Sequence, residues 1–338
     1  MLDHTPGPLL APQVLDFYRG RKVLVAGADG FLGFNCVRSL QRAGARVSIT
    51  TRRATPRIGA VEGSIFRGDL RDPAFAQSAV AGQELVIDLM GSAGPVESNR
   101  DPRNSLDQDC VSHLTLFQAC AESAHTPRVI FASSRLVYGK PLYLPVDEEH
   151  PLNPESIYAV HKITVEHYLR VLRNQRGLDF SIFRISNPYG RYQENNGKAY
   201  GVINHFLRLA ARGEAIQIYG DGRQQRDYIH VDDVSAAFLL AGMNPACEGH
   251  VFNIGGTGGI SLADAARFIC GLANSELRFV PWPDEYRAVE TGDYITDIRK
   301  LASFIHVPPP ISWEQGMASS FDYYRQEAIR RRAVALAS

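Results

Sequence analysis

A tyrosine and a lysine four residues apart form the most chemically suggestive pair in the chain. Tyr158 and Lys162 occur in the segment YAVHK, within a stretch of helical spacing that puts both side chains on one helix face. A tyrosine with an ordinary pKa of about 10 is a poor base at neutral pH. A lysine one helical turn away, together with a cationic nicotinamide ring, stabilises the phenolate form. We therefore expect Tyr158 and Lys162 to be catalytic residues that would lie beside a nicotinamide ring if such a cofactor is bound.

Two serines precede this pair at the end of a predicted strand. The run PRVIFASS is apolar, is typical of a buried strand and ends in Ser133 and Ser134. A serine at the carboxyl end of a strand can hydrogen-bond both a reacting hydroxyl and the tyrosine. A strand-end serine followed by YxxxK favours hydride chemistry at a carbon that bears a hydroxyl group.

A glycine-rich turn near the start of the chain is the candidate cofactor loop. The segment GADGFLG lies between the apolar run VLVAGA and the helical segment FLGFNCVRSLQRAG. Glycine permits the tight turn, lets the backbone approach a pyrophosphate and lets the helix pack against the strand. The amino end of the helix adds free N–H groups and the positive end of its dipole. We predict that a dinucleotide contacts this turn through Gly27, Gly30, Phe31, Leu32 and Gly33.

The ends of the next two strands bear on which cofactor is bound. The second strand, ARVSITT, is followed by Arg52 and Arg53, without the acid that would hold the 2′-hydroxyl of NAD. The two arginines favour NADP(H), whose 2′-phosphate they would bind, unless both are solvated surface residues. The expected cofactor is therefore NAD or NADP, with NADP preferred. Asp69, which ends the third strand beside Leu70, could accept a hydrogen bond from the adenine amino group.

These residues need an alternation of strands and helices to position them. Strand-like runs (SIFRGD, ELVIDLM, PRVIFASS and FSIFRIS) alternate with helical segments through the first half of the chain. This predicts an α/β fold, a Rossmann-type doubly wound parallel sheet, with a smaller C-terminal α/β substrate lobe. We expect a dinucleotide-binding domain at 1–185, with a sheet-like return segment at about 228–256. The substrate lobe would comprise 186–227 and 257–338.

The composition excludes several other classes of protein. The chain has 338 residues, 45% of them hydrophobic and 21% charged, and its formal net charge is zero. No global field therefore attracts nucleic acid or an anionic membrane, and no apolar run approaches the roughly 20 residues of a membrane span. The start lacks a signal-peptide pattern. The five cysteines show no CxxC spacing, which favours reduced thiols, no metal site and a cytoplasmic protein.

The motifs, taken together, resemble those of the extended short-chain dehydrogenase/reductase family, the NAD(P)-dependent nucleotide-sugar epimerases and dehydratases. The resemblance extends from Arg21 to about Tyr324. The matching motifs follow one another in the order GADGFLG, GDLRD, SSRLVYG, YAVHK, RISNPYG, GDGRQQRDYIHVDDV and HVFNIGG. The resemblance implies a nucleotide-diphosphate sugar as the partner, with no role for nucleic acid or membrane.

The resemblance also assigns roles to single residues. Tyr158 would be the general base, Lys162 would also bind the nicotinamide ribose, and Ser134 would hold the sugar hydroxyl at the reacting carbon. Met90 and Gly91, in DLMGSAG, would lie beneath the cofactor.

The substrate diphosphate and base would contact a second group of residues. Asn187 and Arg226 resemble the family's diphosphate contacts, and Arg287 would be a second arginine there, because paired guanidiniums suit a diphosphate. For Arg226 the alternative is a structural ion pair with Asp227 or Asp232. The remaining substrate-side positions are Gln217 and Tyr219 near the base and Val202, with Ile203, on the nucleotide side.

Three positions depart from the family pattern. Asp109 stands where asparagine is usual, and Ser112 where glycine is usual. His161 replaces a small residue beside the lysine, either as a surface residue or as an influence on local pKa values.

The reaction can be narrowed by the residues after Ser134. Family dehydratases carry Asp-Glu there, whereas this chain has Arg135 and Leu136, which argues against dehydration. The same objection applies to decarboxylation, although Arg135 could meet a uronate carboxylate or could face solvent. We predict a nucleotide-sugar 4-epimerase that acts through a transient 4-keto sugar with an enzyme-bound nicotinamide cofactor. The alternatives are an NADPH-dependent 4-keto-sugar reductase and a uronic-acid nucleotide decarboxylase.

Two further hypotheses concern assembly and the absence of turnover. By analogy with the family, we expect a homodimer formed through the helices at 105–124 and 157–174, although their apolar positions could equally be core. A cofactor-binding sensor without turnover would be expected to lack Ser134, Tyr158 or Lys162, and all three are present.

Overall fold

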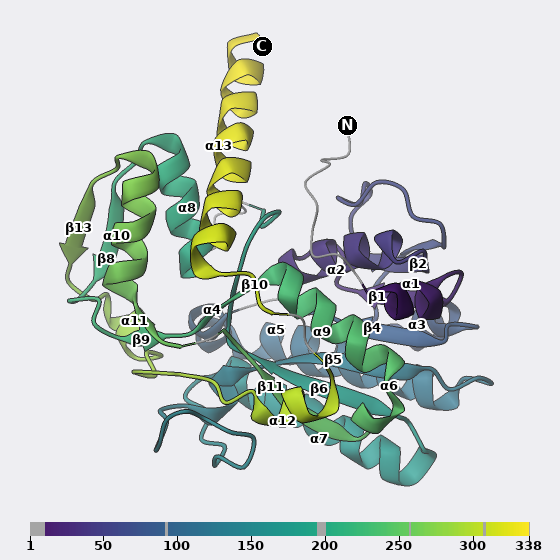
Figure 1. Cartoon of the computed structure of the whole chain (residues 1–338). Coiled ribbons are helices and arrows are strands. Elements are labelled where there is room, and N and C mark those ends of the chain that lie inside the picture. The colour runs from purple at the N-terminus through teal and green to yellow at the C-terminus, as the bar shows by residue number, and fades with distance from the viewer. Residues whose placement is uncertain (1–10, 92–93, 195–200, 257, 307–308, 338) are drawn as a thin grey trace.

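A computed structural model describes residues 11–91, 94–194, 201–256, 258–306 and 309–337 of the chain. A large parallel sheet with helices on both faces forms one part of the molecule, and a smaller lobe lies beside it (Figure 1). The smaller lobe contains α8 (Val202–Arg212), β8 (Ile216–Tyr219), α10 (Leu262–Ala273) and β13 (Leu277–Val280). No helix of the described residues is long and apolar enough to cross a membrane.

The central sheet has seven parallel strands in the order β11-β6-β5-β4-β1-β2-β3. Chain order reverses between β1 and β4, which pair directly, so their carboxyl ends flank the point where such folds bind ligands. The predicted doubly wound parallel sheet is confirmed. Its strands are β1 (Lys22–Ala26), β2 (Arg46–Thr51), β3 (Ile65–Arg67), β4 (Leu85–Asp88), β5 (Arg128–Ser134), β6 (Phe180–Ile185) and β11 (His250–Ile254).

Alternate residues of each strand enter two separate cores. In β1, Val23 and Val25 pack on one face, whereas Leu24 and Ala26 pack on the other. The first face is covered by α1 (Pro12–Tyr18), α2 (Phe31–Arg42) and α9 (Val231–Met243). The second face is covered by α3 (Pro73–Val80), α6 (Ser112–Glu122) and α7 (Ile157–Arg176).

Several short elements connect the strands and the longer helices. They are α4 (Pro95–Arg100), α5 (Pro102–Leu106), a π-helix (Asp107–Val111), 3-10 helices (Arg135–Tyr138 and Pro245–Cys247) and α12 (Arg299–Phe304). Ser156 caps α7, because its Oγ accepts from the N–H of Ala159 at 3.3 Å, and Gly177 ends the helix in the left-handed conformation.

The smaller lobe has a core of its own. Side chains of α8 (Val202–Arg212), α10 (Leu262–Ala273) and the long α13 (Trp313–Ala337) form one apolar cluster. The parallel pair β8 (Ile216–Tyr219) and β13 (Leu277–Val280) packs beside it, followed by α11 (Asp284–Arg287). Two small pairs complete the fold: β7 (Asn187–Tyr189) with β10 (Tyr228–His230), and β9 (Gln225–Arg226) with β12 (Ile260–Ser261).

The return segment at 228–256 is only partly sheet, contrary to the sequence-based expectation. Its centre is the helix α9, and only β11 joins the main sheet, at its edge. The run VSAAFLLAGM is apolar almost throughout, and such a run has no period that separates a buried helix from a buried strand.

Candidate active site

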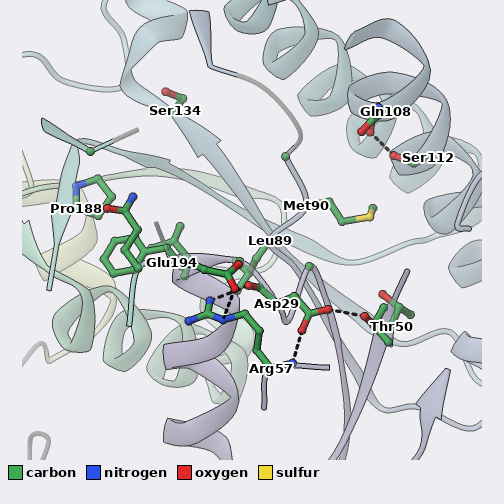
Figure 2. Close-up of a pocket in the computed structure, with 18 of the residues that line it drawn as sticks. Asp29, Thr50, Arg57, Leu89, Met90, Gln108, Ser112, Ser134, Pro188 and Glu194 are labelled. Atoms are coloured by element: carbon green, nitrogen blue, oxygen red, sulfur yellow. Dashed lines mark hydrogen bonds and ion pairs between the residues drawn. The ribbon is translucent and has the colours of Figure 1, made fainter. Parts of the chain in front are cut away.

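A cavity of about 840 Å³ lies at the carboxyl ends of the central strands. One end is lined by the glycine-rich turn and by the ends of β2 and β4. The other end is lined by residues after β5 and by the start of the smaller lobe (Figure 2). The cavity therefore connects the predicted cofactor residues with the predicted substrate residues.

The glycine-rich turn fits close approach by a dinucleotide. Gly27 has φ +80°, and a Cβ there would lie 2.7 Å from the carbonyl of Leu89. Gly30, Phe31 and Leu32 line the cavity, and α2 begins directly after Gly30. Free N–H groups at this helix end suit a pyrophosphate.

Gly33, unlike Gly27 and Gly30, does not line the cavity, and its role is in packing. A Cβ at Gly33 would lie 2.1 Å from the carbonyl oxygen of Gly27. Its missing side chain allows α2 to pack against the turn.

A carboxylate lies at the end of β2, but it belongs to Asp29 of the glycine-rich turn and not to the strand. Asp29 Oδ2 accepts a hydrogen bond from the hydroxyl of Thr51, the last residue of β2. Asp29 Oδ1 accepts the backbone N–H of Arg57 at 2.8 Å (Figure 2). Sequence reasoning missed Asp29 because it looked for the acid on the strand itself. The one available signal was a charged residue in a glycine-rich turn.

Arg52 and Arg53 both line the cavity, but Arg53 is already paired. Glu194 binds it through both carboxylate oxygens, at 3.1 and 2.5 Å, and lies 3.8 Å from Nε of Arg57. The hydrogen bond from Arg53 holds the pKa of Glu194 below its usual range. Within the described part of the chain, the hydrogen bonds of the Arg52 guanidinium are long, at 3.4 and 3.5 Å, and both go to Gln108.

Four predicted residues line the rest of the cofactor end: Asp69, Leu70, Met90 and Gly91. The Asp69 carboxylate accepts from the Arg71 guanidinium at 2.6 Å and from its backbone N–H at 2.9 Å. The hydrogen bond from the Arg71 side chain lowers the pKa of Asp69. Asp69 is therefore a charged acceptor at this end.

The predicted catalytic residues come from the end of β5 and the first turns of α7. Ser134 lines the cavity, and its Oγ accepts the N–H of Leu136 at 3.2 Å. Lys162 is 3% exposed, and its Nζ donates to the carbonyls of Ala132, at 2.8 Å, and Met90, at 3.3 Å. Lys162 does not line the cavity but binds Met90, which does.

Tyr158 is half-buried on the same helix, with its ring centroid 5.8 Å from Nζ of Lys162. Its backbone N–H donates to the hydroxyl of Ser98 at 3.0 Å, which ties the start of α7 to α4. Among the described residues, Tyr158 is not part of the cavity lining.

Ser133 has a structural role. Its hydroxyl donates at 2.6 Å to Glu166 of α7, which is also bound by Arg184 of β6 at 2.7 Å. All three side chains are buried. This chain of polar contacts fixes α7, and so Tyr158, against the two strands.

The positions that depart from the family pattern lie beside the catalytic helix. The Ser105 hydroxyl donates to Asp109 at 3.0 Å and lies 3.1 Å from Nδ1 of His161. His161 is therefore buried rather than a surface residue, and burial lowers its pKa. Ser112 lines the cavity and donates to the carbonyl of Gln108 at 2.5 Å.

Arg135 lines the substrate end of the cavity and does not face solvent. It is 9% exposed, and its Nε and Nη1 donate to Asn187, at 3.3 Å, and to Thr291, at 3.0 Å. Its Cζ lies 4.9 Å from the ring centroid of Tyr294. Burial, followed by repulsion from Arg226, lowers the pKa of Arg135 to about 10.

Arg226 does form an ion pair, but with a partner that the sequence did not indicate. Its Nη2 binds Glu290, and its Nη1 binds the carbonyl of Gly292. Asp232 instead binds Arg191, at 3.1 Å, and Asp227 accepts from Ser186. Both partners considered from sequence are thereby excluded.

The structure places only some of the other predicted substrate residues at the cavity. Asn187, Val202 and Ile203 line the cavity, whereas Arg226 does not. Arg287 is exposed at the end of α11. Gln217 and Tyr219 lie on β8, where the Tyr219 ring packs 5.6 Å from that of Trp282. None of these last three is part of the described cavity lining.

Comparison with known proteins gives the family. The model of the NAD dependent epimerase/dehydratase family matches residues 23–255, which include the glycine turn, Ser134, Tyr158 and Lys162. The chain belongs to this family. The predicted membership of the extended short-chain dehydrogenases is confirmed, and with it an enzyme that uses a nicotinamide cofactor.

Family members with different activities resemble the chain. The UDP-glucose 4-epimerase of Mycolicibacterium smegmatis is 30% identical over 91% of this chain and 99% of its own length. The UDP-N-acetyl-alpha-D-glucosaminuronate decarboxylase of Bacillus cytotoxicus is 27% identical over 90% of this chain and 98% of its own. A structure of MoeE5 in complex with UDP-glucuronic acid and NAD superposes with a TM-score of 0.81. It is 26% identical and covers 90% of this chain and 99% of that one.

Proposed function

We propose that this enzyme is a nucleotide-sugar 4-epimerase. The observation that carries the proposal is the combination of Ser134, Tyr158 and Lys162 with a neighbouring position that lacks acids. Ser134 opens into the cavity, and the residues after it are Arg135 and Leu136. Dehydration needs an acid and a base beside C5 and C6, and no such pair follows Ser134. This argues against dehydration and favours chemistry at C4.

The residues of the chain divide the work at C4. Tyr158 removes the proton of the C4 hydroxyl while Ser134 holds that hydroxyl in place. Lys162, fixed by the carbonyls of Ala132 and Met90, stabilises the phenolate electrostatically. An oxidised nicotinamide bound at the cofactor end of the cavity would supply the acceptor, and then the donor, for the hydride of C4. After the 4-keto sugar has rotated in the cavity to present the other face of C4 for hydride return, Tyr158 gives the proton back to the C4 oxygen.

We infer that the resident cofactor is NAD, with NADP as the alternative. Asp29 supplies a carboxylate at the end of β2, the kind of group that accepts a ribose hydroxyl and repels a phosphate. Glu194 adds a second negative charge and occupies the Arg53 fork. Arg52 is the remaining support for NADP.

The expected substrate is a UDP sugar, as in the names of the relatives. Asn187 and Val202 line the cavity where the nucleotide side would lie. Arg226 would reach a diphosphate after releasing Glu290. Arg52 keeps a reductase as second candidate, and Arg135 favours a decarboxylase.

We also propose a homodimer. Exposed apolar side chains lie on the two helical segments that the family analogy indicates: Leu106 and Val111 on one, Val160 and Val171 on the other. Sedimentation at micromolar concentration tests it, and a monomer would contradict the proposal.

The test of the main proposal needs no added coenzyme. The purified protein is denatured to release and identify any bound nicotinamide, and the native protein is incubated with UDP-glucose and UDP-glucuronic acid. An epimerase holds oxidised cofactor and converts a substrate into its C4 epimer without consuming coenzyme. Tyr158→Phe should abolish this conversion while retaining nucleotide binding. Turnover that requires stoichiometric NADPH would replace the proposal with the reductase.

A further inference from the structure

Arg135 is a buried cation without an anionic partner. Among the described residues, no carboxylate lies within 4.0 Å of its guanidinium, and none of their hydrogen bonds uses Nη2. Its contacts are neutral: the Asn187 amide, the Thr291 hydroxyl and the Tyr294 ring. Buried charges in proteins are almost always paired.

The charge of Arg135 persists under working conditions. Burial lowers the pKa of Arg135 only to about 10, so the guanidinium stays protonated at neutral pH. The neighbouring Arg226 adds repulsion and has Glu290 as its own partner. Glu290 and Asp227 offset part of this repulsion from a distance, but among the described residues neither is in contact with Arg135, so its guanidinium lacks a direct carboxylate partner at the cavity wall.

The position of Arg135 identifies which part of a substrate would compensate it. Arg135 follows Ser134 directly at the end of β5, and both line the cavity. In a hexopyranose the carbon next to C4 is C5, which carries C6, whereas the diphosphate is attached at C1 on the opposite end of the ring. We propose that Arg135 binds the C6 carboxylate of a nucleotide-linked uronic acid, which would make uronic acids the preferred substrates of this site.

The contacts of Arg135 prepare it for a carboxylate. Asn187 and Thr291 hold Nε and Nη1, and Tyr294 supports the face of the guanidinium. A guanidinium fixed in this way loses little conformational freedom when it binds a planar oxyanion. Leu136, the other residue at the position of the missing acids, adds no negative charge that would repel a uronate.

The proposal rests on the proposed function and names its substrate class. The full-length protein with its resident cofactor is assayed with UDP-glucuronic acid and UDP-glucose, and binding of each is measured by calorimetry. We expect kcat/KM and affinity to favour the uronic acid by about 100-fold. Arg135→Met should lose about 100-fold on the uronic acid and at most several-fold on the neutral sugar. Arg135→Lys keeps the charge, so its kcat/KM on the uronic acid should lie between those of the wild type and Arg135→Met. Arg325→Met, at an exposed position of α13, is the matched control.

Each outcome decides between explanations. An equal loss of both substrates in Arg135→Met would assign the arginine to the diphosphate and overturn the proposal. A wild-type preference for UDP-glucose would also overturn the proposal. This comparison needs no variant, so the proposal can be tested even if Arg135→Met does not fold.

Product analysis separates this proposal from the proposed function. A 4-keto uronic acid is a β-keto acid: the C5–C6 bond can break, its electron pair passing to the C4 carbonyl as carbon dioxide leaves. Release of carbon dioxide with retained dependence on Arg135 would refute the epimerase and support the uronate site. Epimerisation confined to neutral sugars would support the epimerase and refute the uronate site.

Discussion

Glu194 and Arg53 join the two parts of the molecule through a bidentate ion pair, with oxygen–nitrogen distances of 3.1 and 2.5 Å. Arg53 follows β2 of the large sheet, and Glu194 follows β7 near the start of the smaller lobe. Both line the cavity at its cofactor end. The cation that the sequence offered to a 2′-phosphate is thus already bound by a carboxylate.

Glu194→Gln should therefore change the choice of cofactor. Removing the carboxylate releases the Arg53 fork and one negative charge, so NADP should bind about 3- to 10-fold more tightly while NAD changes little. Equilibrium binding of both cofactors to cofactor-free protein measures the ratio, and salt should reduce the gain. Glu276→Gln, which removes the carboxylate of an exposed bidentate pair with Arg278, is the matched control. An unchanged ratio would mean that Arg53 lies outside the reach of the cofactor.

The local elements of this site could be predicted from the sequence, because each depends on neighbouring residues. The glycine turn follows from glycine spacing beside an apolar run, and the pair Tyr158 and Lys162 follows from the helical period. Long-range partners have no such signal. Glu194 lies 141 residues from Arg53, and Thr291 lies 156 residues from Arg135. No spacing rule connects residues so far apart in the sequence. The partners of Arg53 and Arg135 could therefore be identified only from the three-dimensional structure.

Lys162→Met should lower kcat about 100-fold or more, because the phenolate of Tyr158 loses its cationic neighbour. The carbonyls of Ala132 and Met90 also lose their donor, which should reduce the free energy of unfolding by about 1–3 kcal/mol. Steady-state kinetics and urea unfolding measure the two effects. Lys140→Met, at an exposed position, controls for loss of a lysine. Nearly normal kcat in Lys162→Met would exclude the lysine from catalysis.

Gly33→Ala should reduce the amount of nicotinamide that copurifies with the protein. The added Cβ would lie 2.1 Å from the carbonyl oxygen of Gly27, so α2 must move away from the turn. Gly271→Ala is a matched control, because that Cβ, on α10, meets no atom within 4 Å. The control should be neutral or up to about 1 kcal/mol more stable. Wild-type cofactor content in Gly33→Ala would show that α2 packing does not shape the loop.

His230 should make the stability of the protein fall in mild acid. Its buried ring accepts the backbone N–H of Asp232 at the start of α9, and burial lowers the pKa of His230 to about 4. An unfolded histidine takes up a proton near pH 6.5, whereas the folded one does so only near pH 4. The unfolded state therefore binds more protons between these values, and the free energy of unfolding should fall by roughly 3 kcal/mol as the pH drops from 6.5 to 4.

His230→Asn keeps an acceptor at the start of α9 but does not titrate, so its stability should depend less on pH than that of the wild type over this range. Urea unfolding at pH 7.5, 6 and 5 measures the difference in slope, which cancels the contributions of other titrating groups. His167→Asn, at an exposed position of α7, should keep the wild-type slope. Parallel curves for His230→Asn and the wild type would mean that the pKa of His230 is the same in the folded and unfolded states, which would contradict the prediction.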